Sequence, residues 1–261
     1  MYNRLPYNQL MSSVLWLLGG IAVLAAFVLV WNTISESGSV SPVFFPPPAK
    51  VWRALIDGFA TSTLSAQTVE TLQRMAIGWL LASVGAITIG CVISVSPLLN
   101  QFLTPSLEFL RPLPASATIP LFIAAFGLSN EMVLAAVSFG AVWPPLLSTI
   151  SGFRSIEPRL YDVSATLGLS RVAFITKVAL PSAFPEILSG MRLSLTISLV
   201  LTIVCEMLAG VGGLGEWILN AGRLFRADNL YAGVILLGAI GLVCDTSLSF
   251  IEARLLRWRT A

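Results

Sequence analysis

Side chains able to do chemistry recur every fourth residue along one stretch of this sequence. They are Ser194, Ser198, Thr202 and Glu206. On a helix this spacing places three hydroxyls and one carboxylate on a single face. Hydroxyls on membrane helices either form hydrogen bonds between helices or line the path of a polar solute, and the three alone favour neither role. An ionisable group in a span usually faces a cavity or a partner, so Glu206 favours a face that lines a solute path.

A second acid, Asp245, lies within a later apolar stretch. Two interpretations are open: it pairs with an arginine such as Arg192 or Arg254, or it lines a gate. Charges inside a membrane usually pair with one another. We therefore expect a structural ion pair at Asp245.

The remaining chemistry is sparse. The sequence has no histidine, which removes the commonest general base and metal ligand. Its two lysines, Lys50 and Lys177, do not follow a glycine-rich loop, so a Walker A phosphate site is absent and energy from ATP would have to come from another chain. The cysteines stand singly in apolar runs, which argues against a disulfide or a metal site. They are Cys91, Cys205 and Cys244.

Gly210, Gly212 and Gly215 fit the spacing GxGxxG of dinucleotide sites. That fingerprint needs a strand before it and a helix after it, within a soluble βαβ unit. Here the glycines follow a long apolar stretch. We therefore expect a tight turn and no nucleotide site.

The elements that must position these residues are membrane helices. Of the 261 residues 56% are hydrophobic and 11% are charged, whereas a soluble domain carries about 25% charged residues. This composition predicts an all-α integral membrane protein with a single domain over residues 1–261 and a core bundle over about 71–251. The first apolar stretch lacks a clear cleavage site and is expected to be a retained span. Six stretches are predicted to cross the membrane: about 14–34, 71–96, 113–128, 131–152, 186–209 and 230–251.

Several of these stretches carry signs of their packing. The third is short, with prolines near its start, so a tilted, kinked or partly buried helix is expected. Proline removes a backbone donor, so a kink is expected near Trp143 in the fourth. After the first, Lys50–Phe59 is expected to form an amphipathic helix on the membrane surface. The second has small residues on one face, which lets helices approach closely: Gly78, Ala82, Ala86 and Gly90.

The distribution of arginine and lysine predicts the orientation. Six spans put both termini on one side, and the side with more basic residues faces the cytoplasm. Ten basic residues would lie on the side of the termini: Arg4, Arg111, Arg154, Arg159, Arg171, Lys177, Arg192, Arg254, Arg257 and Arg259. Five would lie opposite: Lys50, Arg53, Arg74, Arg223 and Arg226. Both termini are therefore predicted to be cytoplasmic.

The same count makes the polar segment 155–182 cytoplasmic. Ser155 is expected to cap a helix whose first turn holds Pro158. Leu160, Val163 and Leu167 then form one apolar stripe. The alternative to a docking element is an amphipathic loop that rests on the bilayer.

The second half of this segment favours docking. Gly168 suits the left-handed conformation that ends a helix, and Ser170 can cap a second short helix. The chain then enters the next span through Pro181 and Pro185. A membrane-resting loop would account for the stripe but not for this break and the spaced prolines.

The segment resembles the EAA signature of permeases of binding-protein-dependent ABC importers. The matching residues are Asp162, Ala165, Gly168, Pro181, Pro185 and Gly190. Further similarity covers 110–128, 189–218 and 241–258, in the branch that imports nitrate, sulfonates, taurine, bicarbonate and related small compounds. Asp162 stands where the signature has glutamate, and Val163 and Ser164 stand where it has alanines.

The resemblance implies an all-α bundle like that of type I ABC importer permeases, in a bacterial inner membrane. It also implies a transport subunit rather than an enzyme. ATP and Mg²⁺ would bind to two partner ATPase subunits, and this chain would hold no cofactor. A second permease subunit, expected to be an identical chain, would complete the path. A periplasmic or lipid-anchored solute-binding protein would face the glycine turn. The role of coupling to the ATPase falls on Asp162, Val163, Ala165, Gly168, Leu169 and Pro181.

The alternative is a secondary transporter driven by an ion gradient. Such a protein would need an acid-rich site at mid-membrane and internal repeats, for which Glu206 and Asp245 are too few. A membrane enzyme is disfavoured because histidine and clustered acids are missing. The residues do not identify the solute.

Overall fold

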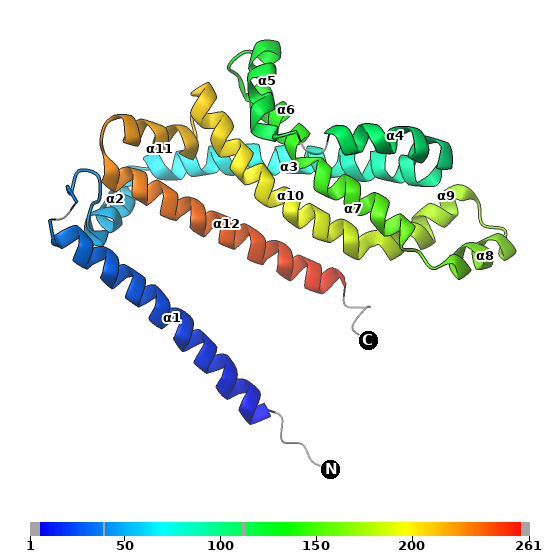
Figure 1. Ribbon diagram of the computed structural model, residues 1–261, viewed down its shortest axis with the longest axis horizontal. Helices are drawn as coiled ribbons and strands as arrows, with labels where there is room; N and C mark the ends of the chain where they lie inside the picture. The colour runs from blue at the N-terminus through cyan, green and yellow to red at the C-terminus, as the bar shows by residue number, and fades with distance from the viewer. Residues whose placement is uncertain (1–5, 39, 111–112, 257–261) are drawn as a thin grey trace.

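The computed structural model describes residues 6–38, 40–110 and 113–256, and within these ranges it is built of helices with no strand (Figure 1). The fold class predicted from composition is confirmed. The helices in chain order are α1 Pro6–Glu36, α2 Pro48–Ala60, α3 Thr63–Val95, α4 Pro97–Leu110, η1 Ala115–Thr118, α5 Ile119–Phe126, α6 Asn130–Ala141, α7 Trp143–Arg154, α8 Pro158–Thr166, α9 Arg171–Phe174, η2 Ile175–Ala179, α10 Leu180–Ala209, α11 Leu214–Arg223 and α12 Ala227–Leu255.

Five helical segments of the described chain are long and apolar enough to cross a membrane. They correspond to five of the six predicted spans: Leu18–Glu36, Thr63–Val95, Asn130–Arg154, Arg171–Ala209 and Ala227–Leu255. The sixth prediction, 113–128, is a shorter apolar helix over Ala115–Phe126. Pro114 leads into a 3₁₀ turn there, and Gly127 ends α5 with a φ of 69°. The third predicted span is therefore too short to cross a bilayer as a straight helix.

The small-residue face of α3 is buried as predicted. Gly78, Ala82, Ala86 and Gly90 all lie among the buried residues of α3. A methyl group added at Gly78 would lie 2.6 Å from Val137 Cγ1, and one added at Gly90 would lie 2.7 Å from Thr149 Cβ. The missing side chains thus let α6 and α7 pack directly on the α3 backbone.

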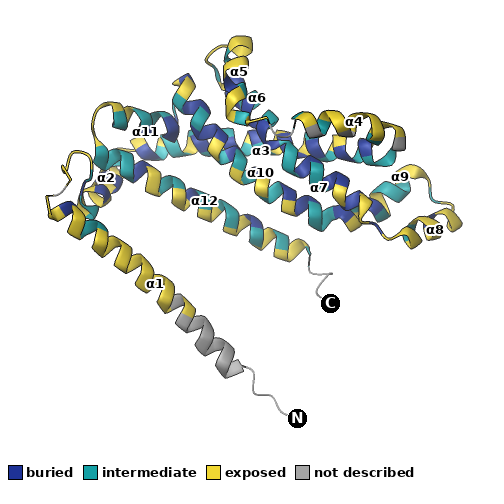
Figure 2. Cartoon of the chain, viewed as in Figure 1, coloured by how far each residue is buried: buried dark blue, intermediate teal, exposed yellow. Residues whose placement is uncertain are grey.

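A break at Val142 separates α6 from α7, as the Trp143-Pro144-Pro145 sequence predicts. Together the two helices form one segment long enough to cross a membrane. This segment and α3 pack against α10, which also contacts α11 and α12 (Figure 2). The helix carrying the predicted chemistry is therefore the central helix of the bundle.

The first helix stands apart from this core. Only 6% of its apolar stretch is buried, and Figure 2 colours nearly all of its described residues as exposed. It is anchored at its end, where the Trp31 indole donates to the Pro46 carbonyl (3.0 Å) and the Ser35 hydroxyl donates to the Phe45 carbonyl (3.0 Å). The amphipathic helix predicted over Lys50–Phe59 is α2. Its Val51 is buried in a core cluster with residues of α3, α10, α11 and α12.

Two ends of the molecule are distinct in Figure 1. One carries α2 and α11. The other carries α8 and α9, and α12 runs from the first end toward it, whereas α1 runs from the first end to the bottom of the view. Both ends of the described chain therefore lie away from the end that carries α2 and α11. Arg4, Arg111, Arg257 and Arg259, used in the charge count, lie outside the described residues.

Candidate functional site

The polar segment begins with a short exposed helix, α8. Pro158 occupies its first turn as predicted, but the prediction that Ser155 caps it is wrong. Ser155 instead ends α7, where its N–H donates to the Ser151 carbonyl (3.0 Å). The residue before α8 is Glu157, which makes no capping bond through its side chain. The physical reason is that α7 continues two residues past its predicted end, which uses Ser155 as a C-cap.

Gly168 ends α8 in the left-handed conformation, with a φ of 66°. The Leu169 N–H donates to the Ser164 carbonyl (3.1 Å), and the Gly168 N–H donates to the Ala165 carbonyl (3.0 Å). These two bonds form a Schellman motif. The Ser170 hydroxyl then accepts from the Ala173 N–H (3.2 Å) and caps α9. Both predictions for this break are confirmed.

Only part of the predicted apolar stripe of α8 faces away from the protein: Leu160 is half-buried and packs against the core cluster around Phe153, whereas Val163 and Leu167 point outward. Val163 is 53% exposed and Leu167 is 69% exposed. Asp162 and Ala165 are exposed too, whereas Ser164 is buried and donates to the Leu160 carbonyl (2.5 Å). Behind the stripe lies a pocket of about 430 Å³ between the ends of α3 and α7 and helices α8 and α9. Tyr161 closes one side of this pocket by packing on the ring of Phe174. α8 therefore presents an unpartnered apolar surface.

The segment enters the next span through Pro181 and Pro185 as predicted, but as a continuous helix that begins before the predicted start at 186. α9 passes through one π turn, η2, directly into α10. Pro181 lies in the first turn of α10 and Pro185 lies inside it. Proline clashes with the carbonyl four residues before it, and for Pro181 this residue is Lys177, inside the π turn. The wider π turn lets the helix continue past the proline.

The polar face of α10 is buried inside the chain. Ser194, Ser198, Thr202 and Glu206 are all fully buried. The Ser194 hydroxyl donates to the Ala141 carbonyl of α6 (2.6 Å), while the hydroxyls of Ser198 and Thr202 donate to carbonyls one turn earlier in α10 (both 2.8 Å). This geometry favours the packing alternative for the hydroxyls. That the face lines a solute path stays a prediction.

Glu206 belongs to a buried cluster that joins α10, α3 and the glycine turn. Its carboxylate accepts from Arg74 Nη1 (2.9 Å), from the Thr71 hydroxyl (2.9 Å) and from the Gly215 N–H (3.0 Å). The Thr71 hydroxyl in turn accepts from the Leu214 N–H (2.8 Å). The carboxylate is thus neutralised and saturated with donors.

Arg74 also holds the glycine turn. Its guanidinium donates to the carbonyls of Val211 (2.7 Å) and Gly212 (2.9 Å), and Nε donates to Asn130 Oδ1 (2.8 Å). Gly213, with a φ of 102°, donates to Gln67 Oε1 and lies so close to the Glu206 carboxylate that a side chain would collide with it. The tight turn expected at the GxGxxG spacing is therefore present.

Sequence reasoning counted Arg74 only as an outer charge and missed its role. A signal was available, because Arg74 and Glu206 are ionisable groups near the same predicted end of two apolar spans. Opposite charges in such positions usually pair. Thr71 and Gln67 carried no comparable signal.

Asp245 pairs with Arg192. Its carboxylate accepts two bonds from the guanidinium, Nε to Oδ1 (2.6 Å) and Nη2 to Oδ2 (2.7 Å). The other arginine considered, Arg254, lies over the ring of Phe250 instead. The two paired side chains are 43% and 41% exposed, so this pair is on the surface of the chain, unlike the cluster around Glu206.

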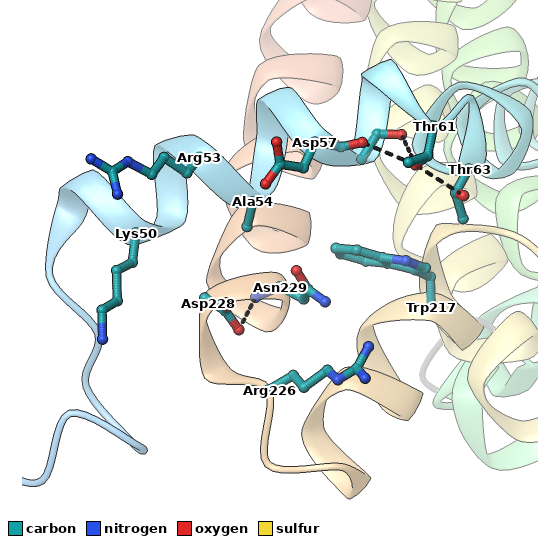
Figure 3. A pocket seen from close by; sticks show the side chains of 11 residues that line it. Lys50, Arg53, Ala54, Asp57, Thr61, Thr63, Trp217, Arg226, Asp228 and Asn229 are labelled. Atoms are coloured by element: carbon teal, nitrogen blue, oxygen red, sulfur yellow. Dashed lines mark hydrogen bonds between the residues drawn. The ribbon is translucent and has the colours of Figure 1, made fainter.

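A charged pocket of about 440 Å³ lies at the opposite end from α8, between α2 and the start of α12 (Figure 3). Lys50, Arg53 and Arg226 line it together with Asp57 and Asp228. Trp217 forms part of its wall. The mixed charges suit a polar protein surface or a polar solute.

Residues 77–260 match the protein family described as "Binding-protein-dependent transport system inner membrane component". Among curated proteins, a putative aliphatic sulfonates transport permease of Bacillus subtilis is 30% identical and covers 93% of this chain and 88% of its own length. A taurine transport system permease of Escherichia coli is 29% identical, with 91% and 88% covered. A nitrate import permease of Leptolyngbya laminosa is 30% identical, with 88% and 85% covered.

Solved structures share the arrangement of helices. A chain of the MetNI methionine ABC transporter in an inward-facing conformation superposes with a TM-score of 0.66 at 17% identity, covering 74% of this chain and 95% of that one. A chain of an amino acid ABC transporter superposes with a TM-score of 0.61 at 15% identity, covering 78% and 97%. At these identities the similarity concerns the fold alone.

Proposed function

Because the chain belongs to the family of binding-protein-dependent transport system inner membrane components, we propose that it forms the path of an ABC importer for a small oxyanionic or sulfonated solute. The relatives named for sulfonates, taurine and nitrate support this class of solute. The chain is a multi-pass membrane subunit of the transporter, and the ATPase activity belongs to a separate subunit.

The exposed stripe on α8 is the observation that carries the proposal. α8 is capped at Gly168, and its side chains Val163 and Leu167 are left exposed by the rest of the described chain. Large exposed apolar side chains on a polar segment are typical of a protein interaction site. The sequence also lacks a Walker A motif, so energy has to reach this chain through a contact.

In this proposal two ATPase subunits bind ATP and Mg²⁺ and dock on α8, with Asp162, Ala165 and Leu169 around the stripe. Closure of the ATPase dimer moves α8, and the rigid connection through α9 and η2 carries the motion into α10. A second, identical permease chain encloses the path. A solute-binding protein docks at the opposite end, near the glycine turn and the charged pocket. Both termini lie in the cytoplasm.

Co-purification and transport test this proposal. The double variant Val163→Ala/Leu167→Ala removes the stripe, and we expect it to lower recovery of the ATPase and ATP-dependent uptake into proteoliposomes by at least about tenfold, since two large apolar side chains contribute about 1.5–3 kcal/mol each when buried. Phe27→Ala is the matched control, because Phe27 is 65% exposed on α1 and lies outside both α8 and the charged pocket. Recovery of the chain without any ATPase, with uptake that survives ATP depletion, would favour the secondary transporter.

A further inference from the structure

The Arg192–Asp245 pair lies inside two helical segments that are long and apolar enough to cross a membrane. Arg192 follows the first residue of α10, Leu180, by 12 residues, or about 18 Å at 1.5 Å per residue. Asp245 precedes the last residue of α12, Leu255, by 10 residues, or about 15 Å. The hydrocarbon core of a bilayer is about 30 Å thick. Counted from the opposite ends, Ala209 of α10 and Ala227 of α12, the pair is about 26–27 Å away, so it lies within both spans but nearer the end of the molecule that carries α8.

The two side chains are nevertheless about two-fifths exposed, and they differ in how many of their hydrogen-bonding groups are occupied. Both carboxylate oxygens of Asp245 are occupied by Arg192. Among the described residues, Nη1 of Arg192 donates to no acceptor. A partly unsatisfied guanidinium in contact with lipid is costly, so charged side chains within a span face a cavity, water or another chain.

Other polar side chains continue from the pair along α10. Ser189 and Thr196 are exposed and lie one turn before and one turn after Arg192, on the same face. Glu186 lies one turn before Ser189 on α10. These two residues line a hollow of about 250 Å³ together with Ser148 and Ser151 of α7. This polar stripe, Glu186–Ser189–Arg192–Thr196, runs along α10 on the side away from the buried hydroxyls.

We infer that the solute path runs along this polar stripe, and that Arg192 binds an oxygen of the anionic group of the solute as it passes. The inference rests on the proposed function, because it takes the anionic solute class proposed there and assigns its recognition to Arg192. The outward N–H groups of Arg192 match the oxygens of a sulfonate, nitrate or bicarbonate. Asp245 positions the guanidinium from α12, and the stripe's acid, Glu186, stands two turns away. The face with Ser198 and Thr202 then serves packing between helices.

Thiol accessibility tests the position of the path. In a background whose three cysteines are replaced by alanine, Ser189→Cys and Thr196→Cys are expected to react with water-soluble methanethiosulfonate reagents in nanodiscs, with or without MgATP. Val243→Cys is the matched control, because Val243 is 63% exposed on an apolar face of α12 and should stay unmodified. Failure of both test positions to react, or equal reaction of Val243→Cys, would overturn the inference.

The charge of the reagent tests the role of Arg192. A unit charge about 7 Å away in water changes the local concentration of a monovalent ion by roughly threefold. The change is an increase for an anion and a decrease for a cation. The ratio of anionic to cationic reagent rates at Thr196→Cys should therefore fall roughly sevenfold in Arg192→Gln. Asp245→Asn should raise the ratio. An unchanged ratio in both variants would remove Arg192 from the path.

The two proposals fail differently in these experiments. Loss of ATPase recovery from the complex refutes the importer function whatever the thiols do. Normal ATPase recovery with unreactive thiols refutes only the path along the polar stripe. Uptake by Arg192→Gln at the wild-type rate, in the presence of normal ATPase recovery, would also refute the role of Arg192.

Discussion

The buried pair of Arg74 and Glu206 makes a quantitative prediction about stability. Arg74→Met removes the only arginine bound to a carboxylate that is fully buried in the described structure. Removing one partner of a buried ion pair costs about 3–5 kcal/mol, because the remaining charge stays buried without compensation. The carbonyls of Val211 and Gly212 lose their donors at the same time. We therefore expect a loss of stability at the upper part of this range.

The measurement is thermal unfolding of the detergent-solubilised complex, followed by fluorescence-detected size exclusion. At roughly 2–4 °C per kcal/mol for a chain of this size, a loss of about 4–5 kcal/mol should lower the midpoint by roughly 8–20 °C. Arg53→Met is the matched control, because Arg53 is exposed and forms no ion pair within the described residues. Its midpoint should stay close to that of the wild-type protein.

A double-mutant cycle separates the pair from its surroundings. Arg74→Met/Glu206→Met removes both charges, so it should be less destabilised than the sum of the single variants, with a coupling of about 2–3 kcal/mol. It should remain below the wild-type protein because the glycine turn has lost its donors. A wild-type midpoint for Arg74→Met, or strictly additive effects, would refute the argument that the charges stabilise each other.

Three further predictions address the loop, the helix contacts and the hydroxyls. Gly168→Ala should cut ATP-coupled uptake without loss of insertion, because left-handed backbone costs a non-glycine residue roughly 1–2 kcal/mol; Gly38→Ala, also at positive φ and with open space, should leave uptake unchanged. Gly78→Ala should lower the unfolding midpoint by the equivalent of about 1–3 kcal/mol, since its methyl group meets Val137, whereas Gly85→Ala has open space and should not lower it. Ser194→Ala should cost about 1 kcal/mol of stability, because it loses the bond to the Ala141 carbonyl of α6. Ser198→Ala should change neither stability nor uptake, because its bond stays within α10. A loss of uptake with Ser198→Ala would instead support the buried face as the solute path.

Much of the fold follows from local patterns. Apolar length predicts five of the spans, and the Trp143-Pro144-Pro145 sequence predicts the break between α6 and α7. Gly168 and Ser170 predict the turn between α8 and α9, because both act through bonds to neighbours in the chain. The third predicted span lies where expected but is shorter than a span, because a 3₁₀ turn precedes it and Gly127 ends it. The Ser155 cap was wrong, since a helix start depends on which residue the preceding helix uses as its own cap.

The sequence by itself therefore determined the class of protein, its spans and the shape of the polar segment, because composition, helical period and capping act over a few residues. Tertiary structure alone decided what each charged residue meets. Arg74 and Glu206 lie 132 positions apart, and Arg192 and Asp245 lie 53 apart. Their environments also differ, buried for Glu206 and half-exposed for Asp245. Burial depends on how distant helices pack around a side chain, and no local pattern on α10 distinguishes its buried hydroxyl face from its exposed polar stripe.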